Sequence, residues 1–313
     1  MKNKILITGG CGYIGTNLTT SLLNDGYNVI VLDTQWFGSY LGKHKNLKII
    51  KTDIRNINSN YFKNVHTVIH LASISNDPSS DLSPKLSWEV GPLATLDILE
   101  NCVKNGVKNF FYASSGSVYG VSKKKVVNEH HNLLPISDYN KQKMVAEKVV
   151  ETFSKKIRTV IIRPATVCGY SKRLRLDTTV NILTYQAYKN NLITVFGGSQ
   201  IRPNIHIDDM VNVYNFFLNN KKSGIFNVGF ENLSVLNIAK LVQKKTNCKI
   251  KILKSNDPRS YRLSSKKILK NKFKPKKKVS DAINELLFFF KNSKFKSTSK
   301  NINVKHLIEN KIK

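Results

Sequence analysis

The stretch TGGCGYIG, Thr8 to Gly15, follows a short apolar run and opens a helical pattern. Glycines at positions 9, 12 and 15 give it the spacing Gly-x-x-Gly-x-x-Gly, which is close to the dinucleotide-binding fingerprint. Glycine permits the tight turn and lets a diphosphate approach the backbone at the N-terminus of the following helix. A glycine-rich turn alone is weak evidence, so the flanking sequence has to decide between a cofactor site and a structural turn.

Short apolar runs rich in β-forming residues recur through the first half of the chain. They are Lys4–Thr8, Asn28–Asp33, Leu47–Asp53, Thr67–Ala72, Asn109–Ser114 and Arg158–Pro164. Such near-continuous runs are typical of strands that are buried on both faces of a parallel sheet. Helical patterns lie between several of them and end at Gly26 and Gly106. This alternation predicts an α/β fold with a doubly wound, parallel Rossmann sheet.

The regular alternation stops after Pro164, and the pattern there indicates a smaller C-terminal α/β substrate domain. A helix at 181–189, a strand at 193–198 and a helix at 234–246 are expected in it. A strand and helix at 205–220 are expected to return to the main sheet. The predicted boundaries are 1–163 with 206–230 for the cofactor domain, 164–205 with 231–290 for the substrate domain, and 291–313 for a basic tail. That tail is rich in Lys, Asn and Ser and is expected to fray.

The net charge of +31 on 313 residues is the unusual feature of the composition. Such charge attracts nucleic acid, anionic membranes or acidic ligands. Here the basic residues are scattered through almost every segment, so a solvated lysine-rich surface is favoured and no nucleic-acid partner is predicted. The longest apolar runs, such as Leu286 to Phe290, are far too short to cross a bilayer.

Four cysteines lie far apart and form no C-x-x-C pair, so neither a disulfide framework nor a metal site is predicted. The chain opens directly with a strand pattern rather than a signal peptide. A reduced, cytoplasmic protein is therefore expected.

Two carboxylates at predicted strand ends are candidates for binding the cofactor. Asp33 closes the second strand, where it would accept hydrogen bonds from the adenosine ribose and repel a 2′-phosphate, which favours NAD over NADP. Asp53, followed by Ile54, ends the third strand, where a carboxylate could meet the adenine amino group.

Tyr139 and Lys143 stand four residues apart at the start of a predicted helix, so they share one face, one turn apart. A tyrosine with a pKa of about 10 is too weak a base at neutral pH. The Lys143 ammonium and the positive nicotinamide ring are expected to lower this pKa. Tyr139 is then able to take a proton from a sugar hydroxyl while hydride leaves the same carbon.

With the stretch YASSGSVYG, Tyr112 to Gly120, these features resemble the extended short-chain dehydrogenase/reductase family. More narrowly, the chain resembles the NAD-dependent nucleotide-sugar epimerases and dehydratases, over nearly its whole length. The resemblance implies catalysis by Ser115, Tyr139 and Lys143, with Ser115 bonding the reacting hydroxyl and Lys143 also holding the nicotinamide ribose. It also implies a homodimer and a nucleotide-diphosphate sugar as substrate.

The resemblance extends to the binding residues. It implies cofactor contacts from Gly9, Gly12, Tyr13, Ile14, Gly15, Asp33, Asp53, Ile54, Leu71, Ala72, Ser73, Tyr139 and Lys143. It implies substrate contacts from Ser115, Thr166, Asn181, Arg202, and Arg259 or Arg262, and the loop residue Asn76 is a further candidate. Guanidinium groups suit the nucleotide phosphates because they bind phosphate oxygens in a fork. His70 is interpreted as structural.

Three positions depart from the family pattern: Gly91 and Thr166 stand where Asn is common, and Cys168 where Tyr is. Dehydratases of the family carry acidic residues directly after the catalytic hydroxyl residue, but here Gly116 and Ser117 follow Ser115. A 4-epimerase that works through a transient 4-keto sugar is therefore favoured. A nucleotide-sugar reductase or dehydrogenase, or a 4,6-dehydratase, is the alternative enzyme, and a cofactor-sensing or nucleic-acid-binding relative is the non-enzymatic one.

Overall fold

The computed structural model describes residues 2–121, 126–255 and 260–312. Its largest element is a seven-stranded sheet in which every strand pair is parallel. Across the sheet the strands are β3 (Leu47–Lys51), β2 (Asn28–Asp33), β1 (Lys4–Thr8), β4 (Thr67–His70), β5 (Asn109–Ala113), β6 (Arg158–Pro164) and β10 (Gly224–Val228). The chain order reverses between β1 and β4, which is the switch point where doubly wound sheets bind nucleotides. The predicted Rossmann fold is confirmed.

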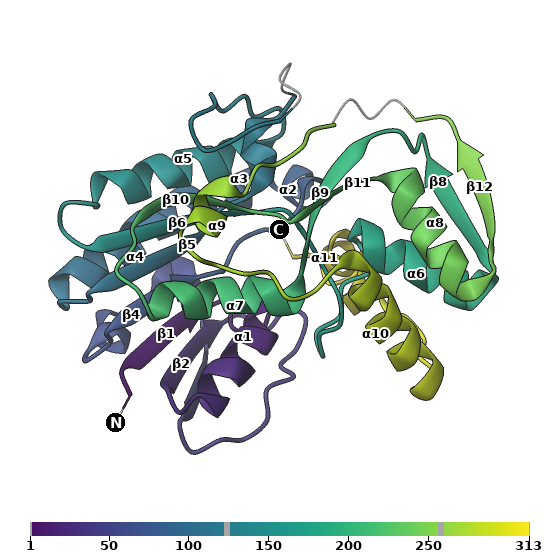
Figure 1. Ribbon diagram of the computed structural model, residues 1–313. Coiled ribbons are helices and arrows are strands. Elements are labelled where there is room, and N and C mark those ends of the chain that lie inside the picture. Colours follow the sequence, from purple (N-terminus) through teal and green to yellow (C-terminus); the bar gives the residue numbers. More distant parts are fainter. Residues whose placement is uncertain (1, 122–125, 256–259, 313) are drawn as a thin grey trace.

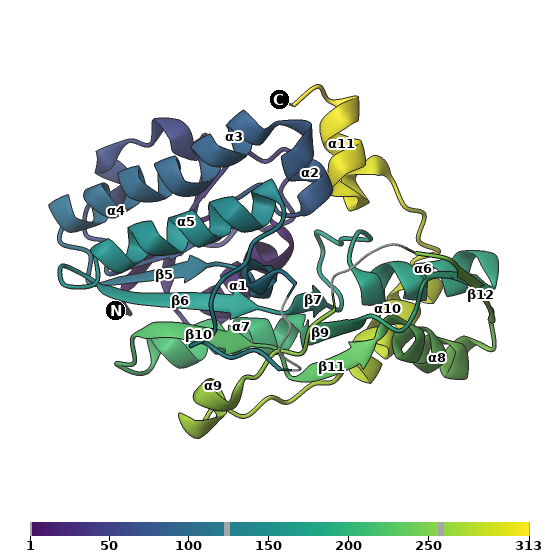
Figure 2. The same cartoon turned by 90° about the horizontal axis from the view of Figure 1, so that it is seen from above.

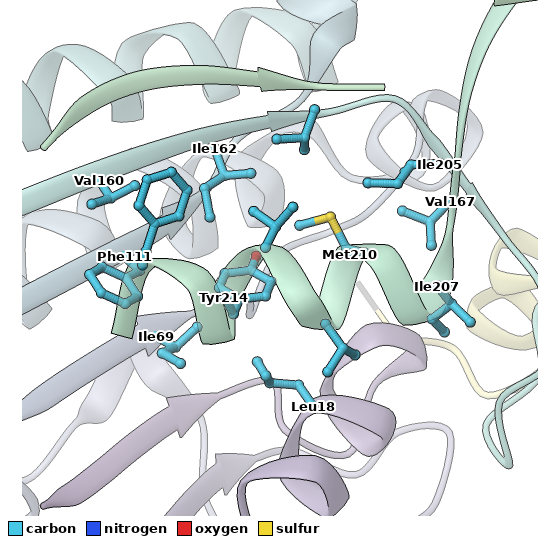
Figure 3. Packing of buried hydrophobic residues seen from close by; sticks show 14 of the residues in the cluster. Leu18, Ile69, Phe111, Val160, Ile162, Val167, Ile205, Ile207, Met210 and Tyr214 are labelled. Carbon is cyan, nitrogen blue, oxygen red and sulfur yellow. The ribbon is translucent and has the colours of Figure 1, made fainter. Parts of the chain in front are cut away.

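Helices cover both faces of this sheet, as Figure 2 shows from above. One face carries α1 (Tyr13–Asn24) and α7 (Ile207–Leu218). The other carries α2 (Asp77–Leu82), α3 (Pro84–Trp88), a π-helical turn η3 (Glu89–Leu93), α4 (Ala94–Lys104) and α5 (Asp138–Thr152). In α7 the apolar residues Met210, Tyr214 and Phe217 recur at helical spacing and belong to the core cluster under this face of the sheet. Figure 3 shows Met210 and Tyr214 among these core side chains.

The smaller part of the molecule holds two short sheets, seen beside the main sheet in Figure 1. β9 (Ile201–His206) lies between β7 (Thr166–Cys168) and β11 (Glu231–Ser234), and β8 (Leu192–Phe196) pairs with β12 (Lys249–Leu253). Helices α6 (Thr179–Asn190), α8 (Val235–Thr246) and α10 (Val279–Asn292) supply their apolar cover. A short α9 (Lys266–Lys270) lies against β10. Thus β9, which was expected in the main sheet, belongs to a small sheet, whereas α7 and β10 do join the main sheet.

Short 3-10 turns connect several strands and helices. They are η1 (Ile54–Asn56), η2 (Ser59–Phe62), η4 (Gly116–Tyr119) and η5 (Ser299–Asn301). Among the described residues no helix is both long and apolar enough to span a bilayer.

The C-terminal tail is ordered, contrary to the expected fraying. After η5 it forms α11 (Asn303–Glu309), which lies beside α2 in Figure 2. Asn303, His306 and Leu307 are buried there. The His306 ring nitrogen Nε2 lies 2.7 Å from the Trp36 carbonyl oxygen, in the loop after β2. These few anchoring contacts outweigh a composition that otherwise favours disorder.

Candidate active site

The glycine turn after β1 is too closely packed for side chains. Gly9 has φ 73°, and a Cβ on it would lie 2.7 Å from the Ala72 backbone nitrogen. A Cβ on Gly15 would lie 2.3 Å from the Gly9 carbonyl oxygen, so this glycine lets α1 start directly against the turn. The first backbone N–H groups of α1 are therefore held at the switch point of the sheet, where they suit an anion.

A pocket opens at this point, beyond the carboxyl ends of the central strands. Apart from Tyr139 and Lys143, all the predicted cofactor residues line it: Gly9, Gly12, Tyr13, Ile14, Gly15, Asp33, Asp53, Ile54, Leu71, Ala72 and Ser73. Asp33 accepts hydrogen bonds from the backbone N–H of Cys11 (2.9 Å) and of Gln35 (2.7 Å). A carboxylate has about four lone-pair sites, so capacity remains for ribose hydroxyls.

The adenine end of this pocket is more strongly paired than the sequence indicated. Asp53 caps η1 and forms an ion pair with Arg55 at 2.8 Å. Arg55 also bonds Glu89 at 2.7 Å. These bonds to Arg55 lower the pKa of Asp53 even though burial acts the other way. The glycine turn, the free helix N-terminus and the carboxylate that ends β2 together fit a dinucleotide such as NAD.

The trio of Ser115, Tyr139 and Lys143 comes together where β5 ends and α5 begins. Ser115 caps η4, and its Oγ lies 2.7 Å from the Ser117 Oγ. The Ser115 hydroxyl also hydrogen-bonds the Tyr139 side chain. Lys143 lies one turn further along α5, is 4% exposed and donates from Nζ to the Ala113 carbonyl oxygen at 2.7 Å. A charged Nζ has three protons, so two remain for ribose hydroxyls.

The expected lowering of the Tyr139 pKa by Lys143 is not found among the protein groups. Burial raises the pKa of Tyr139, the Ser115 hydroxyl and the charge of Arg175 lower it, and Asp77 raises it. Burial also lowers the pKa of Lys143 to about 7, against an opposing effect of Glu147. With a pKa of about 7, the buried amine of Lys143 is only partly charged at neutral pH.

Two neighbours that could be mistaken for acid–base groups are structural. His70 is fully buried between the hydroxyls of Thr8 (2.6 Å) and Thr95 (3.1 Å), and burial lowers its pKa to about 3. Ser114 donates to Glu147, which is bound in turn by Arg163 through Nε (2.9 Å) and Nη2 (2.6 Å). This buried network joins the ends of β5 and β6 to α5 and fixes the strand ends below the trio.

The predicted substrate residues are distributed unevenly around the trio. Thr166 lies half-buried on β7, and Arg202 lies half-buried near the start of β9. The segment carrying Arg262 reaches the catalytic turn, because a Cβ on Gly116 would lie 3.4 Å from the Tyr261 hydroxyl. Arg259 lies outside the described residues.

Asn76 and Asn181 are used inside the protein. Asn76 caps α2 by accepting from the Ser79 N–H at 2.9 Å, and it donates to Asp177 at 2.9 Å. Asn181 is fully buried and accepts from the Gly169 N–H at 3.0 Å. Its amide nitrogen also donates to the Tyr13 hydroxyl at 3.1 Å. The structure thus gives both side chains a role in joining loops, and their contact with substrate stays a prediction.

Two positions that depart from the family pattern have local explanations. A Cβ on Gly91 would lie 2.1 Å from the Oε1 of Gln142, so the Gln142 side chain fills the space above this glycine. Cys168 is fully buried in the core under α6, and its Sγ lies 3.5 Å from the Ile205 carbonyl oxygen.

Sequence reasoning missed a polar cluster beside the pocket. Arg175 pairs with Asp177 at 2.8 Å, and the Asn303 N–H from α11 donates to the same carboxylate at 3.1 Å. Arg173, Arg175 and Asn303 also line the pocket. The only signal in the sequence is the run RLRLD, in which polar side chains alternate with leucine.

One further group could hold a metal ion on geometry alone. Ligand atoms of His206, Asp208 and Glu285 lie within 4.8 Å of one another. The Asp208 N–H donates to His206 Nδ1 at 3.1 Å, and Lys277 neutralises Glu285 at 3.0 Å. His206 Nε2 also lies 3.1 Å from Glu285 Oε2, so a helix cap, a hydrogen bond and an ion pair account for the group.

A tyrosine and a lysine one turn apart, beside a dinucleotide pocket, are the arrangement of Rossmann-fold enzymes that act on a substrate hydroxyl with a nicotinamide cofactor. The sequence profile of the NAD dependent epimerase/dehydratase family matches residues 5–229, so the chain belongs to that family. The resemblance stated from the sequence is confirmed, and NAD is the cofactor.

Individual relatives differ in their reactions. A putative UDP-glucose 4-epimerase of Methanocaldococcus jannaschii is 30% identical over 72% of this chain and 76% of its own. UDP-glucuronic acid decarboxylase 1 of Danio rerio is 28% identical over 77% of this chain and 60% of its own. The structure of a UDP-glucuronic acid 4-epimerase from Bacillus cereus, in complex with UDP-glucuronic acid and NAD, superposes with a TM-score of 0.82. It is 27% identical, and the match covers 93% of this chain and 99% of that one.

Proposed function

We propose that the protein interconverts nucleotide-diphosphate sugars that differ in configuration at C4, by NAD-dependent oxidation and re-reduction of that carbon. The observation that carries this proposal is the make-up of the turn at Ser115. Its hydroxyl bonds Tyr139, while Gly116–Tyr119, the turn that follows, contains no carboxyl group. A reaction that expels water needs an acid near the leaving hydroxyl, whereas transfer of hydrogen at C4 needs only one proton acceptor.

The chain's own residues supply the proton chemistry. Ser115 hydrogen-bonds the C4 hydroxyl and orients it toward Tyr139, which takes its proton and later returns it to the 4-keto oxygen. Arg175 supports this step because its charge lowers the pKa of Tyr139. Lys143 holds the ribose of the cofactor through the protons that Ala113 does not use. Bound NAD supplies the acceptor, and afterwards the donor, of the hydride at C4.

The nucleotide site is proposed from the charge of two arginines. Arg202 on β9 and Arg262, which follows Tyr261 beside the catalytic turn, suit the two phosphates of a nucleotide sugar. Relatives that act on UDP-sugars make UDP the first nucleotide to test.

Dehydration is the second candidate, and one carboxylate favours it. Asp77 accepts a hydrogen bond from Ser137 and raises the pKa of Tyr139 through its charge. A dehydratase using this acid would lose its activity in the Asp77→Asn variant. A 4-epimerase would keep most of its turnover, since the proton moves between Tyr139 and the substrate.

The experiment is incubation of the purified protein with UDP-, GDP-, CDP- and dTDP-sugars and analysis of the products by NMR and mass spectrometry. The proposal expects a 4-epimer of unchanged mass, with no net consumption of NAD. A product lighter by one water or by carbon dioxide, or reduced cofactor formed in step with product, would reject it.

We also propose a homodimer formed on the face of η3 and α4. Leu93, Leu96 and Val103 are 57%, 37% and 38% exposed there, at spacings that keep them on one side. Sedimentation of a Leu96→Glu variant should then give a monomer. Leu134→Glu, in a loop where the side chain is 56% exposed, is the control that should stay dimeric.

A cytoplasmic location is proposed as well. The four cysteines, Cys11, Cys102, Cys168 and Cys248, are all free and buried. Unpaired buried thiols suit a reducing compartment.

A further inference from the structure

The loop of residues 169–175 is fastened to the first turns of α1. The Tyr13 hydroxyl donates to the Gly169 carbonyl at 2.7 Å, and the Ser171 hydroxyl donates to the Tyr13 carbonyl at 2.9 Å. Asn17 adds a third bond, from its amide to the Tyr170 carbonyl at 3.1 Å. The loop is therefore held beside the helix N-terminus that faces the cofactor pocket.

Arg173 of this loop is a buried cation that forms no direct ion pair within the described residues, although Asp33 and Asp177 act on it through their charges. It is 3% exposed, and its guanidinium carbon lies 4.1 Å from the centre of the Phe37 ring. Nη2 donates to the Asn303 side-chain oxygen at 2.6 Å, and Nη1 contacts the Leu174 carbonyl at 3.4 Å. Within the described part of the chain its buried Nε has no hydrogen-bond partner.

The electrostatics of this position favour an anionic ligand. Both hydrogen-bond acceptors of Arg173 are neutral oxygens. Burial and the charge of Arg175 lower the pKa of Arg173 to about 10, although the charge of Asp177 acts the other way. A buried charge with an unpaired hydrogen-bond donor costs free energy. Phosphate oxygens reduce this cost most effectively for a guanidinium, because they accept its hydrogen bonds in a fork.

We propose that Arg173 binds the diphosphate of the cofactor opposite the N-terminus of α1, and that α11 holds it in place through Asn303. Gly12, Tyr13, Arg173 and Asn303 all line the same pocket, so one anion can meet the helix N-terminus and the guanidinium together. The inference uses NAD as the cofactor of the family and is independent of the reaction at C4.

The C-terminal helix is thereby part of the cofactor site. Besides binding Arg173, the Asn303 amide donates to the Ser75 hydroxyl at 2.8 Å, in the loop after β4. His306, one turn along α11, contacts the Trp36 carbonyl in the loop after β2. The helix joins loops on both sides of the pocket, so it slows release of the cofactor.

The test measures binding rather than activity. Arg173→Leu is compared with Lys172→Leu, an exposed cation at the neighbouring position. Calorimetry with NAD, ADP, 2′-AMP and adenosine separates recognition of the diphosphate from recognition of the nucleoside. Because a charge-assisted bond is lost, Arg173→Leu should weaken NAD and ADP about 10- to 100-fold and leave adenosine within about twofold. Lys172→Leu should leave all four ligands within about twofold of the natural chain.

Two further variants keep the proposal testable if Arg173→Leu folds poorly. Arg173→Lys retains the charge and should recover part of the ADP affinity. Asn303→Leu removes the acceptor from α11 and should speed NAD release while leaving adenosine affinity unchanged. Three results for Arg173→Leu would each overturn the assignment. They are an equal loss of affinity for adenosine and ADP, a loss of affinity for 2′-AMP alone, and an unchanged affinity for NAD.

Discussion

Replacing Glu147 by Gln is expected to lower the free energy of unfolding by about 3 kcal/mol or more, as is typical when one partner of a buried ion pair is removed. The carboxylate is 1% exposed and its partner Arg163 is 3% exposed, so water cannot take over the lost interaction. Two guanidinium bonds and the bond from Ser114 converge on Glu147. The amide leaves the Arg163 charge buried without an opposing one.

Urea unfolding of the natural chain and the variant, in the presence of saturating NAD and without it, gives the difference. Glu151→Gln is the matched control, on the same helix and with a Lys148 partner at 2.8 Å, but its carboxylate is 39% exposed. Such a solvated pair is worth at most about 0.5 kcal/mol. Replacing both Glu147 and Arg163 by Met should recover much of the loss.

The same substitution changes the chemistry of the neighbouring lysine. The Glu147 charge opposes the effect of burial, so its loss moves the pKa of Lys143 further below about 7. In a profile of kcat/KM against pH, the fall in activity that follows deprotonation of Lys143 should then occur at a lower pH than in the natural chain. Equal stability losses in Glu147→Gln and Glu151→Gln would refute the assignment of a buried pair.

The other predictions concern the trio and the cofactor. Tyr139→Phe should lower kcat about 10²- to 10⁴-fold by removing the proton acceptor, with NAD affinity unchanged in calorimetry. Lys143→Met should raise the Tm near pH 7, because the amine is protonated in the unfolded chain at this pH but only partly protonated when it is buried in the folded one. The gain in Tm should shrink as the pH rises from about 7 toward 10.5, where the unfolded chain also loses this proton. Lys148→Met, an exposed change on the same helix, should show no such trend. Asp33→Ser should raise the affinity for NADP relative to NAD, measured by calorimetry, because the charge that repels a 2′-phosphate is gone.

Each of these three predictions has its own result that would contradict it. A Tyr139→Phe enzyme with natural kcat would place the proton on another group. A Tm gain in Lys143→Met that is the same at pH 7 and pH 10 would remove the link to ionisation. An unchanged cofactor preference in Asp33→Ser would show that the carboxylate does not face the ribose.

The main sheet could be predicted because its signals are local. Each of the six predicted strands is an apolar run bounded by turn residues, and β1, β2 and β6 have the expected ends. The glycine turn is also local, since Gly9 and Gly15 are required by contacts within one βα unit. The position of Tyr139 and Lys143 on one face of a helix could be predicted from the helical repeat alone.

What the sequence did not reveal depends on contacts between distant segments. Arg173 and Arg175 enter the pocket because the loop after β7 binds α1, more than 150 positions earlier in the chain. Asn303 arrives from a tail whose Lys- and Asn-rich composition favours disorder, although buried Leu307 anchors it. The pKa of Tyr139 depends on burial, which the Tyr-x-x-x-Lys spacing does not report.

The most direct test of the central claim follows the hydrogen at C4. A nucleotide sugar that is accepted in the panel is prepared with deuterium at C4 and incubated with the enzyme in ordinary water. The account predicts a 4-epimer that keeps its deuterium at C4, formed with no net reduced NAD and lost in Tyr139→Phe. A product without deuterium at C4, or a dehydrated keto sugar, would contradict it.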